Sequence, residues 1–161
     1  MTDVTVGKDL DKDVVRAYIA GFLDGDGAVT AVIEPHAGKK FRFRVRVALD
    51  FYQHKDNVKL LRYLIKVFGE GSLGRSIRDT HKLSLRNQTT LKCILPLLYP
   101  FSRIKRNQIR IALRILHTAI RGENDLHKVA RLADELSSHN VRSRGRRKNF
   151  SAMIVSSSRN D

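Results

Sequence analysis

The segment from Phe41 to Gln53 constrains the fold most, because its side chains alternate with a period of two residues. Every odd position from Phe41 to Phe51 is apolar. The even positions at its start are basic: Arg42, Arg44 and Arg46. Successive side chains of a β-strand point to opposite faces. The segment is therefore predicted to be a strand with one face on a core and a basic face on the other side.

The other apolar patterns place this strand in an ordered set of elements. Helices are expected at Val14–Leu23, Asp56–Phe68, Thr89–Tyr99, Ile104–Arg121 and Asn124–Ser138, and strands at Ala28–Pro35, Ser72–Ile77 and Lys82–Arg86. The order helix–strand–strand–helix–strand–strand–helix, with extra C-terminal helices, predicts an α+β fold (αββαββα). Its four strands are expected to form one antiparallel sheet.

Length and local composition set the domain organisation. A chain of 161 residues can bury one core, so residues 1–140 are expected to form a single domain. Residues 141–161 begin with five basic residues among Ser and Gly, which predicts a basic, partly mobile tail. Between the first helix and the next strand, the glycines of Asp24-Gly-Asp-Gly27 permit positive φ, so a tight exit turn is expected there.

The charge balance points to a polyanionic partner. Lys+Arg 31 against Asp+Glu 16 gives a formal net charge of +15, which favours nucleic acid or an acidic membrane face. No apolar run approaches the roughly 18 residues of a membrane span, so no membrane partner is expected. The single cysteine excludes an internal disulfide and a cysteine zinc site. The first residues lack a secretion-signal pattern, so an intracellular location is expected, in a prokaryotic cytoplasm or an organelle.

The segment Ile19-Ala-Gly-Phe-Leu-Asp-Gly-Asp-Gly27 resembles the signature of the LAGLIDADG homing endonucleases, with both glycines and both aspartates in register. A second segment, Pro100–Gln108, is similar to the family segment with the active-site lysine, which falls on Lys105. Gln53 falls on the family's active-site glutamine. Asn57 departs from the basic residue that some members carry there, and His54 and Lys55 are the candidates to replace that charge.

The resemblance implies a site-specific, intron-encoded endonuclease. Such a protein makes a staggered double-strand cut in a long pseudo-palindromic DNA site by hydrolysis with Mg²⁺. Mn²⁺ or Ca²⁺ are the expected substitutes, Ca²⁺ without catalysis. One motif per chain implies a homodimer packed through Ala20 and Gly21, because a two-fold protein reads a two-fold target.

The chemistry assigns a role to each candidate catalytic residue. Hydrolysis of a phosphodiester needs neutralised oxygens, so Asp26 and the Gly25 carbonyl are the expected metal ligands. Asp24 is expected to be a helix-terminal or turn residue instead. Lys105 can stabilise charge developing on the phosphate. Gln53 cannot act as a general base, because its amide does not titrate near neutrality, and it is expected to position water.

The family also implies that the sheet lies in the major groove of double-stranded DNA, which admits β-structure. Alternation and charge select the expected DNA contacts. Base contacts are expected from Thr30, Val32, Glu34, His36, Arg42, Arg44, Arg46, Arg75, Arg78, Lys82, Ser84 and Arg86, and phosphate contacts from Lys39, Lys40, Arg142, Arg144, Arg146 and Arg147.

Plainer interpretations stand beside these. Lys105 can be one charge on a solvated basic helix face with Arg106, Arg110 and Arg114. At the level of function, one alternative is an RNA maturase that assists splicing of its host intron. The other is a DNA-binding regulator of the same fold that does not cleave. Asp26, Gln53 and Lys105 together favour the enzyme, since a binding module has no use for a carboxylate aimed at phosphates.

Overall fold

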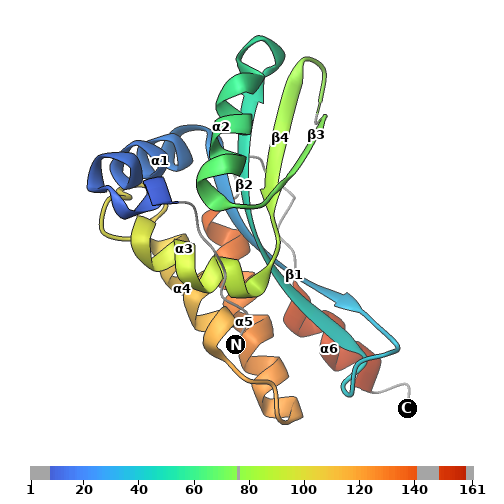
Figure 1. The fold of residues 1–161 in the computed structure, drawn as a ribbon. Helices are drawn as coiled ribbons and strands as arrows, with labels where there is room; N and C mark the ends of the chain where they lie inside the picture. Colours follow the sequence, from blue (N-terminus) through green and yellow to red (C-terminus); the bar gives the residue numbers. More distant parts are fainter. Residues whose placement is uncertain (1–7, 76, 141–148, 159–161) are drawn as a thin grey trace.

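A four-stranded antiparallel sheet organises the molecule (Figure 1). The computed structural model describes residues 8–75, 77–140 and 149–158. The strands are β1 (Gly27–Pro35), β2 (Phe43–His54), β3 (Ser72–Arg75) and β4 (Thr80–Leu85). Their order in the sheet is β1-β2-β4-β3. The predicted α+β class with one antiparallel sheet is confirmed.

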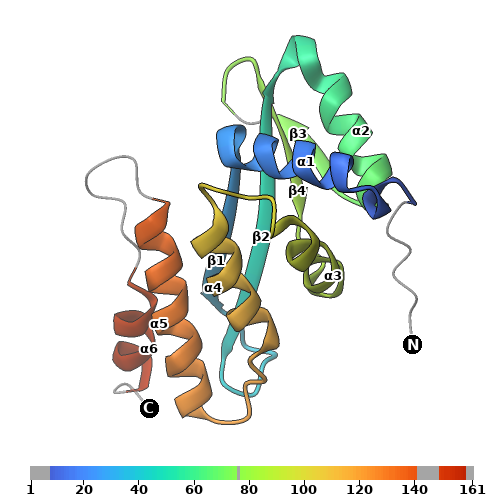
Figure 2. The same ribbon diagram turned by 90° about the vertical axis from the view of Figure 1, so that its left-hand side faces the viewer.

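Six α-helices accompany the sheet in the described part of the chain. They are α1 (Asp13–Asp26), α2 (Val58–Phe68), α3 (Gln88–Leu98), α4 (Arg106–His117), α5 (Glu123–His139) and α6 (Phe150–Ser158). Two short 3₁₀ turns, η1 (Lys8–Asp11) and η2 (Lys55–Asn57), precede α1 and α2. Figure 2 shows α1 crossing in front of β1 and β2, with α4 beside it on the same side of the sheet. No helix in the described ranges is long and apolar enough to cross a membrane.

One face of the sheet packs on the helices and forms the core. At the odd positions of β2, Val47, Leu49 and Phe51 are fully buried, and Phe43 and Val45 are partly buried against the same core. Phe51 also lies against the ring of Phe68 on α2, with 5.8 Å between ring centroids. The period-two pattern thus predicts the buried face correctly, because pleating fixes which side each residue faces. The even positions of β2 are left for the opposite, open face.

The sheet has a four-stranded half and a two-stranded half. In β2, residues Leu49 to His54 pair with β4, and Leu49 to Phe51 among them also pair with β1, whereas the stretch from Phe43 to Ala48 pairs with β1 alone. The side chain of Gln88 takes the place of a strand neighbour at Val47. It accepts a hydrogen bond from the Val47 amide at 3.1 Å and donates one to the Val47 carbonyl at 2.9 Å. The outer half of β2 therefore has an edge that no strand covers.

The predicted exit turn after the first helix is wrong. Helix α1 continues through Gly25 to Asp26, and Gly27 has φ −117, which is extended backbone. Gly27 is needed for space: a Cβ there would lie 2.5 Å from a methyl carbon of Leu23 and 2.8 Å from its Cα. The chain enters β1 directly from the helix, so the end of α1 is rigidly joined to the sheet.

Two other sequence-based expectations are corrected. Arg42 does not belong to the strand; it lies in the hairpin loop with φ 58, so β2 begins at Phe43, one residue pair later than expected. Part of the predicted C-terminal tail, residues 149–158, carries helix α6. Phe150 and Ile154 are buried in the core, and the amide of Phe150 donates to Asp134 on α5 at 2.6 Å. Two apolar residues four positions apart are enough to dock a short helix within the segment expected to be a basic tail.

Candidate active site and nucleic-acid interface

Asp24 is the buried carboxylate at the end of α1. Its Oδ1 accepts hydrogen bonds from the Ser102 hydroxyl at 2.6 Å and the Lys105 amide at 2.9 Å. Its Oδ2 accepts from the amides of Arg103 and Ile104 at 2.6 and 3.1 Å. Burial acts to raise the pKa of Asp24, but these four hydrogen bonds outweigh it and hold the pKa below its ordinary value. As expected, Asp24 is a structural residue, and it fixes the loop that leads into α4.

Asp26 is the exposed carboxylate, two residues further on. It is the last residue of α1, and no described residue forms a hydrogen bond or ion pair with its side chain. Gly27 pairs with Phe51, which places Asp26 at the same end of the β1–β2 pair as Gln53. The Asp24 hydrogen bond places the Lys105 backbone beside this end of α1. The elements that carry Asp26, Gln53 and Lys105 therefore meet at one end of the sheet.

Gln53 and Lys105 differ in how they are held. Gln53 is partly exposed, and its Oε1 accepts from the His54 amide at 2.9 Å. Lys105 is the N-cap residue of α4 and only 7% exposed. The interpretation of Lys105 as one of several solvated charges is therefore wrong, because the exposed basic face of α4 belongs to its neighbours, such as Arg106 and Arg110.

The residues at this end fit a partly hydrated divalent ion. The oxygens of Asp24 are occupied by four donors, which leaves Asp26 as the free carboxylate of the pair. Within the described ranges, no group of three His, Cys, Asp or Glu residues is arranged to hold a metal. Mg²⁺ takes oxygen ligands, keeps several waters and uses few carboxylates. One Asp26 with the neighbouring Gly25 carbonyl suits such an ion.

The charge missing at Asn57 is not replaced by a free neighbour. The Lys55 ammonium is 2.9 Å from Asp79 in the β3–β4 turn. The His54 ring nitrogen Nδ1 lies 3.2 Å from the Asp56 carboxylate and accepts from the Asp56 amide. Both candidates are thus engaged with acidic neighbours beyond the end of β2.

The open face of the sheet carries most of the predicted DNA-contacting residues. The even positions that share this face with Arg44 are Thr30, Val32 and Glu34 on β1, Arg46 on β2, and Lys82 and Ser84 on β4. The loops that border it hold His36, Lys39, Lys40, Arg42 and Arg78, and Arg86 follows β4. Arg142, Arg144, Arg146 and Arg147 lie outside the described residues.

Arg75 does not share the open face by register. It pairs with His81, and the pair has the same parity as Leu73 and Leu83, whose side chains turn toward the core. Arg75 stays exposed only because β3 ends there. The error arose because β3 was too short for its alternation to be read from the sequence.

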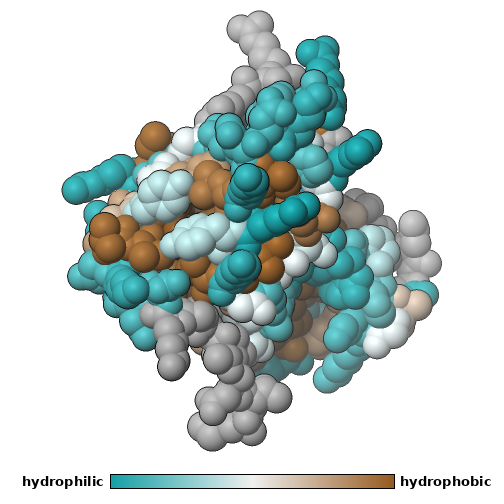
Figure 3. All heavy atoms as spheres, turned by 45° about the horizontal axis from the view of Figure 1, so that its top comes forward, coloured by the Kyte–Doolittle hydropathy of each residue, from teal (hydrophilic) through white to brown (hydrophobic). Residues whose placement is uncertain are grey.

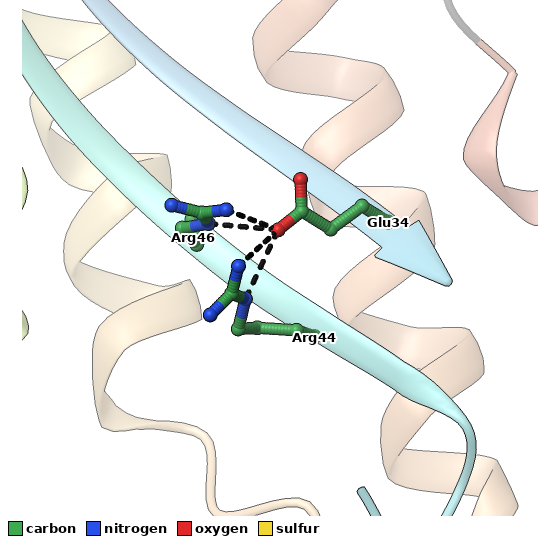
Figure 4. A network of polar contacts seen from close by, with 3 residues as sticks. All are labelled: Glu34, Arg44 and Arg46. Carbon is green, nitrogen blue, oxygen red and sulfur yellow. Dashed lines mark hydrogen bonds and ion pairs between the residues drawn. The ribbon is translucent and has the colours of Figure 1, made fainter. Parts of the chain in front are cut away.

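Glu34 joins two arginines on the open face (Figure 4). Its Oε1 accepts from Nε and Nη2 of Arg44 at 3.0 and 2.7 Å. The same oxygen accepts from Nε of Arg46 at 2.9 Å and from its Nη2. Hydrogen bonds from Arg46 and Arg44 hold the pKa of Glu34 below its ordinary value, so the carboxylate stays ionised near neutrality.

A second acidic residue on this face, Asp50, was not predicted as a site residue. It is 6% exposed, and its Oδ1 accepts from the Ser84 hydroxyl at 2.5 Å. The Lys82 ammonium lies 3.7 Å from its other oxygen. Burial, together with the Asp50 charge, raises the pKa of Tyr52. The available signal was that the basic alternation of the strand ends at Asp50.

The outer side of α1 is apolar and exposed. Val14 and Tyr18 are 74% and 52% exposed, and Tyr63 of α2 is 38% exposed. With Val15 and Leu60 they line a hollow of about 340 Å³. Figure 3, which looks obliquely onto the top of the molecule, shows a hydrophobic area on this side. A Cβ at Gly21 would meet nothing within 4 Å, but Ala20 is fully buried within the chain, so its side chain offers no surface to a second copy.

Comparison with known proteins agrees with this arrangement. The model of the LAGLIDADG endonuclease family matches residues 19–112. The chain belongs to this family. The matched region begins at the first residue of the nonapeptide and ends inside α4, so it contains Asp26, Gln53, Lys105 and all four strands.

Two relatives of known activity are similar to this chain over part of their length. The chain is 28% identical over 100 residues to the DNA endonuclease I-CvuI of Chlorella vulgaris, which covers 62% of each protein. It is 30% identical over 102 residues to the DNA endonuclease I-CreI of Chlamydomonas reinhardtii, which covers 62% of this chain and 60% of that protein. The chain thus spans less than two thirds of either relative by sequence.

Solved structures extend the likeness of fold to most of the chain. The structure of I-CvuI with its DNA target and calcium superposes with a TM-score of 0.80 over 89% of this chain and 92% of that one, at 23% identity. The DNA complex of the archaeal intron-encoded homing endonuclease I-Vdi141I gives 0.74 over 89% and 96%, at 19% identity. The LAGLIDADG fold therefore extends beyond the region matched by sequence.

Proposed function

We propose that this chain is a site-specific homing endonuclease that makes a staggered double-strand cut in a long pseudo-palindromic DNA site by Mg²⁺-dependent hydrolysis. The supporting observation is an exposed Asp26 carboxylate, with no partner among the described residues, at the inner end of a sheet whose open face is basic. A carboxylate there repels DNA phosphates unless a cation lies between them. The relative I-CvuI is described in complex with DNA in the presence of magnesium or calcium, which supports a divalent metal.

The residues at this end divide the chemical work. Asp26 and the Gly25 carbonyl would hold the ion, which, when bound, supplies charge neutralisation and a more acidic bound water. Gln53 orients water through its amide, because an amide does not titrate near neutrality. Lys105 stabilises charge on the phosphate. Asp24 acts indirectly: its hydrogen bonds to the loop from Ser102 to Lys105 set where Lys105 stands.

We further propose that the active species is a homodimer packed through the outer side of α1. Gly21 and Gly25 lie on a helix, where glycine is less stable than alanine by roughly 1 kcal/mol. A Cβ at either position would meet nothing within 4 Å inside the chain. A second helix approaching closely explains both glycines, and exposed Val14 and Tyr18 supply apolar contact. A two-fold axis there would bring two Asp26 residues together.

A cleavage assay with the full chain tests the function. The substrate is a supercoiled plasmid with the uninterrupted sequence of the gene that hosts this reading frame. With Mg²⁺ we expect a single linear product, and no product after chelation with EDTA. Binding of that duplex without linearisation in Mg²⁺ or Mn²⁺ would favour the regulator. Binding of intron RNA in preference to the duplex would favour the maturase.

Salt dependence tests the docking surface separately. If a dimer neutralises about ten phosphates, the logarithm of the binding constant should fall against the logarithm of salt concentration with a slope near −9. Fluorescence anisotropy with a labelled duplex measures this slope. A slope near zero would contradict binding through the basic face.

A further inference from the structure

Arg44 and Arg46 donate to the same oxygen of Glu34, an arrangement that charge attraction alone does not require. Glu34 is directly opposite Arg44 in the β1–β2 pairing, whereas Arg46 is opposite Val32, which cannot pair with it. Arg46 nevertheless reaches diagonally to the oxygen that Arg44 uses (Figure 4). Two like charges on one strand face would otherwise separate. Glu34 holds them together, and the trio keeps a net charge of +1.

The way the arginines are held leaves one edge of each free. A guanidinium group is a planar fork with one pair of donors at Nε and Nη2 and another at Nη1 and Nη2. Glu34 occupies the first pair on both arginines. Within the described residues, no hydrogen bond of Arg44 or Arg46 uses Nη1. The remaining pair matches the N7 and O6 acceptors of guanine in the major groove.

Stability does not account for this arrangement. The side chains of Arg44 and Arg46 are each 37% exposed, and that of Glu34 is 34% exposed. Ion pairs with this much solvent contact add little to folding stability. Holding two long side chains in one geometry before binding instead reduces the ordering cost when a ligand binds. The arrangement is therefore more useful for recognition than for folding.

The surroundings of the trio indicate nucleic acid. Arg44 and Arg46 lie in the outer half of β2, which pairs with β1 alone and has its even positions on the open face. Lys39 and Lys40 in the β1–β2 loop and Arg86 just after β4 add positive charges that suit flanking phosphates. The guanidinium nitrogens meet at one oxygen, so they lie within about 6 Å of each other, less than two base-pair steps of about 3.4 Å.

From this geometry we infer that Glu34 is a positioning residue that locks Arg44 and Arg46 into one unit reading two adjacent guanines in the outer part of each half-site. This inference rests on the proposed DNA-directed function and names the bases involved. The two arginines engage Oε1 of Glu34, so Glu34 could accept a hydrogen bond from cytosine only through Oε2. Asp50 has no such role, because it is buried and bonded to Ser84.

Selection from a pool of randomised DNA duplexes tests the inference with the full chain. Wild type is compared with E34Q and with E135Q, which removes one negative charge from an exposed position on α5. Wild type and E135Q should enrich guanine at two adjacent outer positions, each roughly 10-fold or more over other bases. In E34Q, the guanine preference should fall about 10-fold, and it should fall at both positions in the same variant. Its affinity for random DNA should stay the same or rise.

Single arginine variants keep the test decisive. R44A and R46A should each remove the guanine preference at one of the two positions. Combining E34Q with either variant should reduce the guanine preference little further, because the effects of coupled residues are not additive. The double variant R44K/R46K keeps the charge but lacks the planar fork, so it should lose both preferences whatever E34Q does to folding. Melting temperatures of all variants are measured alongside.

Three outcomes would overturn the inference. They are an unchanged profile for E34Q, a uniform loss of affinity at all positions, and guanine preferences that survive R44K/R46K. If wild type enriches no duplex at all, the proposed DNA-directed function fails as well. Enrichment by wild type with an unchanged E34Q profile rejects the role of Glu34 alone.

Discussion

The inner and outer sides of the C-terminal end of α1 carry the same residue type in opposite environments. On the inner side, Asp24 is buried and accepts four hydrogen bonds from the loop before α4. On the outer side, Asp26 is exposed, and no described residue pairs with it. A helix turns by about 100° per residue, so positions two apart face different ways. The comparison separates a buried carboxylate that holds a loop of the fold from an exposed carboxylate that the described residues leave open to a ligand.

The variant D26N tests this contrast between Asp24 and Asp26 most directly. We expect cleavage to fall at least about 1,000-fold, because the neutral amide is a poor ligand for a hard cation. Duplex binding should change little, and the free energy of unfolding should stay within about 0.5 kcal/mol of wild type. Single-turnover cleavage, anisotropy and urea denaturation measure the three quantities. A large loss of stability in D26N would show that Asp26, like Asp24, is structural.

The variant K105M tests whether the ammonium group of Lys105, in the loop held by Asp24, contributes to cleavage. Methionine keeps an apolar stem of similar length without the ammonium group. Cleavage at saturating DNA should fall about 100-fold, because a charge that stabilises the transition state is lost. Binding should weaken much less. Equal cleavage rates for K105M and wild type would show that Lys105 has a structural role only.

D24N should show the opposite pattern to D26N. The amide cannot accept four hydrogen bonds as a carboxylate does, and its buried NH2 group, itself a donor, would face donors instead of acceptors. We expect a loss of about 2–3 kcal/mol in the free energy of unfolding. Cleavage by the folded protein should fall about 10-fold through displacement of Lys105. Urea denaturation and single-turnover rates at low temperature distinguish these effects, with D26N as the matched control. Unchanged stability in D24N would contradict the assigned role.

Acid titration provides a graded version of the same contrast. Because the folded-state pKa of Asp24 lies below its ordinary value of 3.8, its ionised form stabilises the fold. That contribution is fully present above about pH 3.8 and is lost as pH falls through the lower folded-state pKa. The stability gap between wild type and D24N should therefore close at acid pH. A gap that stays constant down to pH 2 would contradict this linkage.

The smallest expected effect is that of S102A. It removes one of the four donors to Asp24, at 2.6 Å, and leaves the three amides. We expect a loss of about 1 kcal/mol. S151A is the matched control: the Ser151 hydroxyl donates to Asp134 at the same 2.6 Å but on α6, away from the site. It should not affect cleavage, whereas S102A should lower the rate slightly. Denaturation midpoints and cleavage rates test both.

Local periodicity was sufficient for most of the fold. The apolar face of β2 and the order of the elements were predictable because both depend on residues near in sequence. Element ends were less accurate: α1 continued through Gly25 because Gly27, and not a left-handed glycine, makes the transition to β1. α6 was missed because its two core residues, Phe150 and Ile154, only gain meaning against α5.

The family, the basic sheet face and the positions of Asp26, Gln53 and Lys105 could all be predicted before the fold was known, because motif spacing and a repeat of two carry them. Which carboxylates are engaged inside the fold depends on tertiary contacts. Asp24 meets its donors about eighty residues away, and Glu34 meets Arg46 diagonally across two strands. Such contacts depend on how distant segments dock, and burial and hydrogen bonding then fix whether each charge supports the fold or faces a ligand.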